Sequence, residues 1–175
     1  SAKSKLIDKR IIKNRETPFL LMLRAATSAK KFLVSRKAKS ITIFIGKGNN
    51  GEDGLCLAAL LKIENIKTHV IDLEFKNRPE SQAYKLCIDL GIKIERFNRN
   101  KIPSSDWYVD GVFGIGLNRD LQGNYLRAIN YLQCSQSKKI LSLDLPSGLD
   151  GSKGIIFNSA VKATATITFL TLKPG

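Results

Sequence analysis

Short runs of β-branched and apolar residues alternate with helix-like stretches along most of this sequence. The runs read SITIFIG, KTHVIDL, IKIERF, DWYVDGVFG, KKILSLDL and ATITFLT, and turn residues lie near each of them. Helical patterns cover 51–65, 79–90 and 123–133 between these runs, and another helix is expected with Thr17 as N-cap and Pro18 as its first residue. Strands that alternate with helices form βαβ units, so the sequence predicts an α/β fold with a mostly parallel sheet covered on both faces.

The length of 175 residues suits a single domain with one packed core. No apolar run approaches the roughly 18 residues that span a bilayer, and the N-terminus lacks the apolar region of a signal peptide. The three cysteines, Cys56, Cys87 and Cys134, fall within helix-like patterns and do not have the spacing of a metal or disulfide site. We therefore expect buried thiols in a cytoplasmic chain that has no membrane partner.

The formal net charge of +14 can indicate a polyanionic partner, because basic proteins gain affinity for nucleic acid by releasing counterions. Residues 1–40 hold twelve Lys or Arg and two acids, so +10 of this charge lies there and the rest of the chain is nearly balanced. Charge alone reports solubility and nonspecific attraction. Nucleic acid is therefore not the expected partner.

Three loops that follow predicted strands combine glycine with acidic or amide residues. They read GKGNNGEDG at 46–54, DGVFGIGLNRDLQG at 110–123 and DLPSGLDG at 144–151. In an open parallel sheet, ligands bind outside the carboxyl ends of the strands, near the point where the strand order reverses. The sequence therefore places the functional site in these loops.

The first loop matches the dinucleotide fingerprint G-x-G-x-x-G. Gly46, Gly48 and Gly51 follow a predicted strand and open a predicted helix, and Asp72 lies about twenty residues further on, at the end of the next strand. By itself this pattern indicates an NAD-linked dehydrogenase. A dehydrogenase also needs a second region that places its substrate, and no part of this sequence is large enough to be one.

Acidic and amide residues in the same loop argue for another use. Glu52 and Asp53 put two carboxylates at the helix N-terminus, where the pyrophosphate of a dinucleotide would otherwise rest. Asn49 and Asn50 tolerate left-handed backbone and offer carbonyl and amide groups, so they could coordinate a cation, bind hydroxyls or simply reverse the chain. The glycine fingerprint alone therefore does not establish redox chemistry.

The other two loops each follow an apolar strand that contains a carboxylate. Asp110 interrupts its strand, and a buried carboxylate is costly unless it is paired, hydrogen-bonded or bound to a metal. Asp144 ends its strand, where desolvation and neighbouring charge can shift a pKa, although it could also be a simple Asx-turn cap. Arg119 could hold a phosphate through its planar guanidinium or form a surface ion pair with Asp120 or a glutamate.

Histidine provides no catalytic set in this sequence. The single histidine, His69, lies on the second predicted strand and is expected to be structural. Proton chemistry must then depend on Asp, Lys or water. Any metal must be a hard, oxygen-bound cation, held by Asn50, Asp110 and Ser147 with waters or carbonyls.

Four ordered segments resemble the signatures of one family. GKGNNGEDG, VDGVFGIGLNRDLQG, LDLPSGLDGSKG and AVKATATITFLTLKPG are similar in order and spacing to those of the YjeF N-terminal domain family, the NAD(P)H-hydrate epimerases, and LLMLRAATSA resembles its first helix. The resemblance covers nearly the whole chain and implies a three-layer α/β/α Rossmann-like fold. It also implies an isomerase that interconverts the R and S epimers of NADH and NADPH hydrated at carbon 6 of the dihydropyridine ring.

The resemblance implies roles for individual residues. Asn50, Asp110 and Ser147 would bind a potassium ion, and Asp144 would touch the reacting ring. The residues that would bind the substrate are Asn49, Asn50, Gly51, Glu52, Asp53, Gly114, Ile115, Gly116, Leu117, Asn118, Arg119, Asp120 and Asp144. Our hypothesis is that Asp144 is the catalytic acid and base at the ring hydroxyl. Loss and re-addition of water and opening and reclosure of the ring both remain open as routes.

Two positions depart from the usual pattern of the family: Lys47 stands where proline is common and Glu52 where glycine is common.

Family domains generally continue beyond the position that corresponds to residue 175 here. Residues 1–175 are therefore expected to be a single YjeF N-terminal-type domain that is truncated at its C-terminal end. The expected partner is a dehydratase that uses ADP or ATP, downstream on the same chain or separate. Homodimers are frequent in the family and are a further expectation.

A rival interpretation comes from the same resemblance. The fold also serves as a catalytically inactive scaffold or RNA-associated assembly domain, and the basic N-terminal region would suit an anion. A scaffold has no need of Asp110, Asp144 and the paired asparagines together. The presence of all of them favours the enzyme.

Overall fold

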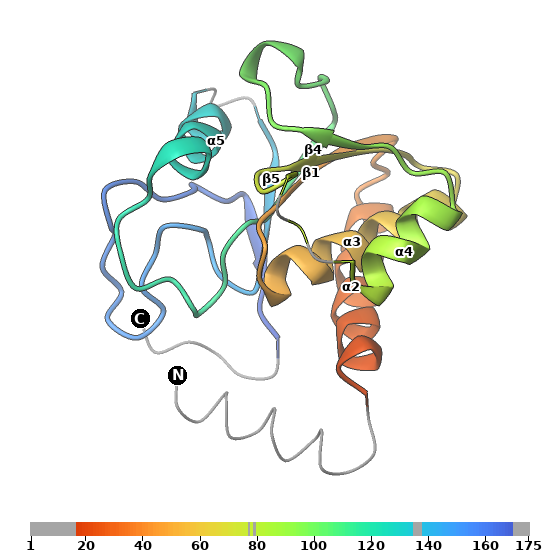
Figure 1. The fold of residues 1–175 in the computed structure, drawn as a ribbon, viewed down its shortest axis with the longest axis horizontal. Coiled ribbons are helices and arrows are strands. Elements are labelled where there is room, and N and C mark those ends of the chain that lie inside the picture. The colour runs from red at the N-terminus through yellow and green to blue at the C-terminus, as the bar shows by residue number, and fades with distance from the viewer. Residues whose placement is uncertain (1–16, 77, 79, 135–137, 170–175) are drawn as a thin grey trace.

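The computed structural model describes residues 17–76, 78, 80–134 and 138–169. The basic segment 1–16 and the last six residues of the fourth signature segment lie outside the described residues. Within the described part of the chain, six strands form one parallel sheet in the order β3-β2-β1-β4-β5-β6 (Figure 1). In chain order they are β1 Ser40–Ile45, β2 Lys67–Asp72, β3 Ile94–Arg96, β4 Trp107–Gly111, β5 Ile140–Leu143 and β6 Ala165–Ile167. Each predicted run contains one of these strands, so the predicted parallel sheet is confirmed.

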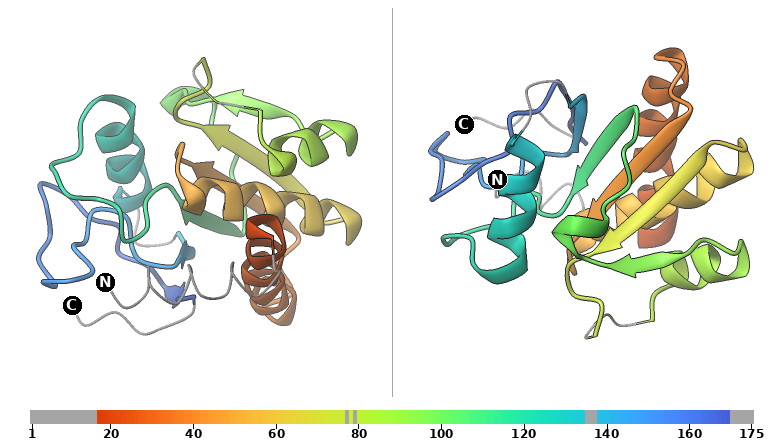
Figure 2. Two further views of the ribbon diagram at one scale, coloured as in Figure 1. Left: turned by 60° about the horizontal axis from the view of Figure 1, so that its bottom comes forward. Right: turned by 90° about the horizontal axis from the view of Figure 1, so that it is seen from above.

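Helices cover both faces of this sheet. Three of them lie on one face and α5 lies on the other, as the two views of Figure 2 show. In chain order the helices are α2 Pro18–Ser35, α3 Asn49–Ile63, α4 Gln82–Asp89 and α5 Gly123–Gln133, with a 3-10 turn η1 at Arg99–Lys101 before β4. The buried apolar residues accordingly form two clusters, one around Leu57 and the other around Phe44 and Ile129. The three-layer α/β/α fold is confirmed.

Capping interactions set where the helices begin. The hydroxyl of Thr17 accepts a hydrogen bond from the amide of Leu20 at 3.3 Å, which confirms the predicted N-cap. Helix α3 begins two residues before the predicted start, because the carbonyl of Gly48 already accepts from the amide of Glu52 at 3.2 Å. Helix α4 begins three residues later than predicted, because Ser81 caps it. No helix within the described residues combines the length and apolar character needed to cross a bilayer.

The strand order reverses at β1, which lies between β2 and β4. In the sheet register Ile45, the last residue of β1, is paired with Asp72 of β2 on one side and with Gly111 of β4 on the other. Because all the strands are parallel, their carboxyl ends meet at one edge of the sheet. The loops after β1, β4 and β5 are the three glycine-rich and acidic loops, so the fold brings them to the reversal point where such sheets bind ligands.

The prediction for the cysteines is wrong in one case. Cys56 on α3 and Cys87 on α4 are fully buried, as predicted, but Cys134 is exposed. Cys134 is the C-cap residue of α5 and therefore follows the last turn that packs on the sheet. Its sulfur lies 3.8 Å from a guanidinium nitrogen of Arg99.

The order in which the three thiols are labelled should follow their exposure. Burial is the main cause that raises the pKa of Cys56 and of Cys87 to about 12, so neither thiol forms a reactive thiolate near neutral pH. We expect a maleimide to modify Cys134 first in the native protein and all three cysteines in urea. Peptide mass spectrometry measures the order, and native labelling of Cys56 or Cys87 at the rate of Cys134 would contradict it.

Candidate functional site

The backbone of the first loop packs directly on the second. The amide of Gly46 donates to the carbonyl of Gly111 at 3.2 Å. A Cβ at Gly46 would overlap the carbonyl oxygen of Val112, and a Cβ at Gly51 would overlap the carbonyl oxygen of Gly46. A Cβ at Gly48 would meet open space. Two of the three fingerprint glycines are therefore needed for close backbone packing, which is a structural reason for them that requires no phosphate.

Asp110 is fully buried in β4, and both of its carboxylate oxygens are hydrogen-bonded. Oδ1 accepts from the hydroxyl of Ser147 at 2.5 Å and from the amide of Val112 at 3.2 Å. Oδ2 accepts from the amide of Ser147 at 2.8 Å and from the hydroxyl of Ser142 at 2.9 Å. Burial raises the pKa of Asp110, and these hydrogen bonds oppose the rise. The prediction that this carboxylate needs partners is confirmed, and the partners come from β5 and the third loop.

Asn50 and Ser147 meet at the backbone of Phe113. The side-chain amide of Asn50 donates to the backbone carbonyl of Phe113 at 2.9 Å. The backbone amide of Phe113 in turn donates to the hydroxyl of Ser147 at 2.9 Å. Since Ser147 also binds Asp110, the fold brings the three predicted cation ligands together from three loops. The side-chain oxygen of Asn50 is buried and has no hydrogen-bond partner among the described residues.

Asp144 lies between the second and third loops. Its φ of 62° is in the left-handed region, which is uncommon for a residue other than glycine and is often found at functional sites. Its amide donates to the carbonyl of Ile167 in β6 at 2.8 Å, and its Oδ1 accepts from the amide of Phe169 at 3.5 Å. Its other oxygen lies so close to Gly114 that a Cβ there would be 2.9 Å from it. The half-buried carboxylate of Asp144 is therefore held against the glycine-rich second loop.

The second loop also borders a groove of about 190 Å³. Lys47 of the first loop, Leu117 and Arg119 of the second loop, and Tyr125 of α5 are among its lining residues. Of the predicted substrate-binding residues, Asn49, Gly116, Asn118, Arg119 and Asp120 are exposed, Asp53, Gly114, Ile115, Leu117 and Asp144 are half-buried, and Asn50, Gly51 and Glu52 are buried. The exposed groups and the groove are thus near the reversal point, where a ligand can reach them.

The alternative of an ion pair between Arg119 and Asp120 is not found among the described residues. The carboxylate of Asp120 instead accepts a hydrogen bond from the amide of Asn158 at 3.2 Å. Arg119 therefore remains a candidate for holding a phosphate in the groove.

Arg78, which the sequence did not single out, connects the first loop to β2. Its side chain is 2% exposed. Its guanidinium donates to Asp72 at 2.6 Å, to the carbonyl of Gly46 at 2.5 Å and to Glu52 at 3.2 Å. The hydroxyl of Ser81 donates to the other oxygen of Glu52. One buried guanidinium thus binds two carboxylates and supports the glycine turn.

The sequence predicts the carboxylate of Glu52 at the start of α3, and the structure shows which groups bind it there. The carboxylate of Glu52 is hydrogen-bonded by Arg78 and Ser81, so it is held within the protein and does not lie free in solvent. An arginine in a turn after β2 belongs to no recognisable motif. The sequence offered no signal for it except that Asp72 and Glu52, if buried, would need a cation.

Named relatives match this chain over most of its length. The NAD(P)H-hydrate epimerase of Levilactobacillus brevis is 32% identical over 161 residues, which cover 89% of this chain and 74% of the relative. The bifunctional NAD(P)H-hydrate repair enzyme Nnr of Coxiella burnetii is 34% identical over 163 residues, which cover 89% of this chain and 33% of the relative. The chain therefore spans about a third of the bifunctional relative and about three quarters of the single-function one.

The fold and a family profile agree with these relatives. The crystal structure of yeast ynu0 superposes with a TM-score of 0.86 at 22% identity, covering 99% of this chain and 80% of the yeast chain, so the two share their fold. The profile of the YjeF-related protein N-terminus matches residues 19–175. With nearly all of the described residues inside that match, the chain belongs to the family of YjeF-related protein N-termini.

Proposed function

We propose that this chain is an NAD(P)H-hydrate epimerase, an isomerase that interconverts the R and S forms of NADH or NADPH hydrated at carbon 6 of the dihydropyridine ring. The observation that carries the proposal is the placement of Asp144, whose carboxylate is held in a left-handed turn against Gly114 at the carboxyl ends of β4 and β5. The names of relatives that match 89% of this chain support the same activity.

Asp144 is the group that can move a proton in this mechanism. In its acid form it protonates the hydroxyl on carbon 6, and water leaves with assistance from the ring nitrogen. The resulting carboxylate then takes a proton from water that adds to the other face of the ring, which inverts the centre. Acid–base help of this kind contributes about 10²- to 10⁴-fold in rate. Gly114 lets the second loop approach this carboxylate closely, because a Cβ at position 114 would lie 2.9 Å from its Oδ2.

We propose in addition that Asn50, Asp110 and Ser147 hold a potassium ion. The donors are an amide oxygen, a carboxylate and a hydroxyl, the oxygen ligands that hard cations take. The buried and unpartnered oxygen of Asn50 fits such an ion, because a buried acceptor without a donor is otherwise costly. The ion would supply positive charge that offsets Asp110 and fixes the three loops relative to one another. The three residues also fix these loops through their own hydrogen bonds.

Potassium should stabilise the protein against heat through this site. At about ten to a hundred times its Kd a bound ion adds about 1.4 to 2.7 kcal/mol to the free energy of unfolding. We expect a higher Tm in potassium chloride than in tetramethylammonium chloride of the same ionic strength. The Asn50→Ala variant should lose this difference between the salts, whereas Asn130→Ala on α5 should keep it. An equal Tm in the two salts for the parent protein would exclude the site.

The direct test of the activity is the epimerisation of purified R-hydrated NADH by the purified chain, followed by chromatography of the two epimers. A rate equal to the uncatalysed rate would exclude the enzyme. The rival function, an RNA-associated scaffold, predicts binding to single-stranded RNA with a steep salt dependence and no binding to nucleotides.

We further propose that an ADP- or ATP-dependent dehydratase acts on the S epimer and that the chain works in the cytoplasm. We also propose that it forms a homodimer, and sedimentation measures this oligomeric state.

A further inference from the structure

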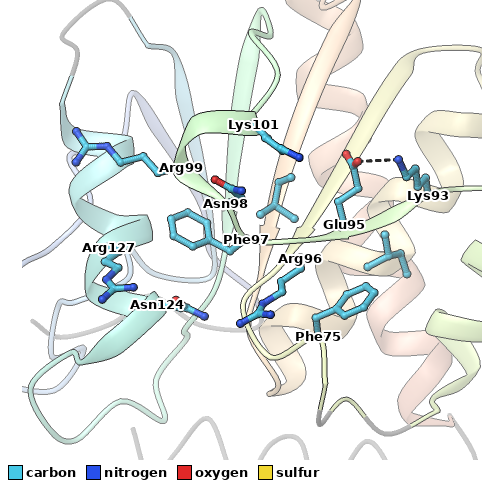
Figure 3. Close-up of a pocket in the computed structure, with 12 residues that line it drawn as sticks. Phe75, Lys93, Glu95, Arg96, Phe97, Asn98, Arg99, Lys101, Asn124 and Arg127 are labelled. Atoms are coloured by element: carbon cyan, nitrogen blue, oxygen red, sulfur yellow. Dashed lines mark ion pairs between the residues drawn. The ribbon is translucent and has the colours of Figure 1, made fainter.

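The groove lined by Lys47, Arg119 and Tyr125 is too small for a whole dinucleotide. Its volume is about 190 Å³, whereas pockets for drug-sized ligands occupy roughly 300–1,000 Å³. A second cavity of about 650 Å³ opens between β3 and the start of α5 (Figure 3). Glu74 and Tyr125 line the groove, and the adjacent residues Phe75 and Asn124 line the cavity. The two hollows are therefore neighbours. Burial and a hydrogen bond to Glu74 raise the pKa of Tyr125, which lines the groove.

Cationic side chains dominate the second cavity. They are Lys93, Arg96, Arg99, Lys101 and Arg127, against one acid, Glu95, which Lys93 already pairs at 3.0 Å. In Figure 3 the side chain of Asn124 lies between those of Arg127 from α5 and Arg96 from β3. Among the described residues, neither of these two arginines has an ion-pair partner. The cavity therefore presents unneutralised guanidinium groups to an anion, and guanidinium binds phosphate in a bidentate manner.

The position of this cavity in the fold indicates which part of the substrate it faces. In dinucleotide-binding sheets the pyrophosphate lies at the loop after the first strand, and a carboxylate at the end of the second strand reads the ribose 2′-hydroxyl. Asp72 occupies that place here, but it is 1% exposed and both of its oxygens are bound, by Arg78 and by the amide of Glu74. Its partner across the sheet is Arg96. An arginine at this place accommodates a 2′-phosphate.

We infer that the cavity between β3 and α5 binds the adenosine end of the dinucleotide, with Arg96 and Arg127 on a 2′-phosphate, so that hydrated NADPH is the preferred substrate over hydrated NADH. This inference rests on the proposed epimerase function. The ring of Phe75, which is 46% exposed and lies beside Arg96 in Figure 3, provides a face on which the adenine can stack. Asp72 cannot select the free 2′-hydroxyl, because Arg78 already occupies its carboxylate.

Two isomeric ligands test the inference without any catalysis. The compounds 2′,5′-ADP and 3′,5′-ADP carry the same charge and differ only in the position of one phosphate. We expect calorimetry on the whole chain to show about ten- to a hundredfold tighter binding of 2′,5′-ADP, the range expected for a hydrogen bond to a charged group. The Arg96→Gln variant should lose most of this preference. Lys62→Gln, which removes one positive charge from the end of α3, should keep it.

The outcomes separate this inference from the proposed function. Equal affinity for the two isomers, or a preference that survives in both Arg96→Gln and Arg127→Gln, would overturn the inference. Epimerisation of hydrated NADH and hydrated NADPH with equal kcat/KM would also overturn it, while leaving the epimerase intact. If neither hydrate is epimerised but the Arg96-dependent preference for 2′,5′-ADP is found, the binding site stands and the proposed function fails.

Discussion

Replacement of Asp144 by asparagine should lower the rate of epimerisation of hydrated NADH by about 10²- to 10⁴-fold, the contribution expected from a positioned acid and base. The amide of asparagine has nearly the shape of the carboxylate but cannot donate a proton to the leaving hydroxyl or accept one from water. Asparagine also tolerates the left-handed backbone that residue 144 adopts, with its φ of 62°. The loss should therefore appear in kcat while the Tm stays close to that of the parent protein.

The matched control for this variant is Asp89→Asn. Asp89 is exposed at the end of α4, and this helix lies outside the three loops of the site. Its replacement should therefore leave kcat unchanged. Chromatography of the R and S epimers over time provides the rates, and circular dichroism verifies the fold. Full activity in Asp144→Asn would exclude the role of Asp144 and would move the proton chemistry to another group of the site.

Replacement of Arg78 by methionine should lower the free energy of unfolding by about 3–5 kcal/mol, the cost of removing one partner from a buried ion pair. The side chains of Asp72 and Glu52 are 1% and 12% exposed, so without Arg78 both carboxylates would be left in the protein interior without a cation. The carbonyl of Gly46 would also lose its donor. Urea unfolding followed by fluorescence of Trp107 measures the change, and the slope of the transition shows whether the denatured state has changed as well.

Lys85→Met is the matched control for the loss of a cation. Lys85 and its partner Glu80 are 64% and 75% exposed, and exposed ion pairs contribute little. The free energy of unfolding of the Lys85→Met variant should stay within about 0.5 kcal/mol of the parent value. A similar result for Arg78→Met would show that Asp72 and Glu52 do not depend on this guanidinium.

The local pattern of the sequence was sufficient for the fold. The six β-branched or apolar runs contain the six parallel strands, of which β1, β4 and β5 are buried along nearly their whole length, as expected for strands covered on both faces. Helix α2 begins where Thr17 and Pro18 predict it, because capping is a local hydrogen bond. The starts of α3 and α4 were less predictable, since Gly48 and Ser81 compete with neighbouring residues for the same role.

The residues of the candidate site stand out in the sequence, but their interactions do not. Asp110 and Asp144 stand out because a carboxylate in or at the end of an apolar strand is unusual. Ser147 holds Asp110 through both its hydroxyl and its amide, although the two residues are 37 positions apart in the chain, and this contact depends on how β4 and β5 are placed. The burial of Cys134 was predicted wrongly because its position past the end of α5 is set by where the helix stops.

The sequence by itself determined the layered fold, the three loops and the carboxylates that can act in them, because strand and helix periodicity, capping and turn chemistry are properties of neighbouring residues. Only the tertiary structure decided which charges are free. Arg78 is shared between Asp72 and Glu52, the side-chain oxygen of Asn50 has no hydrogen-bond partner among the described residues, and Arg96 faces a cavity without a counterion in that part of the chain. Electrostatic partners are chosen by distance in space, and a contact between residues far apart in sequence leaves no periodic pattern along the chain.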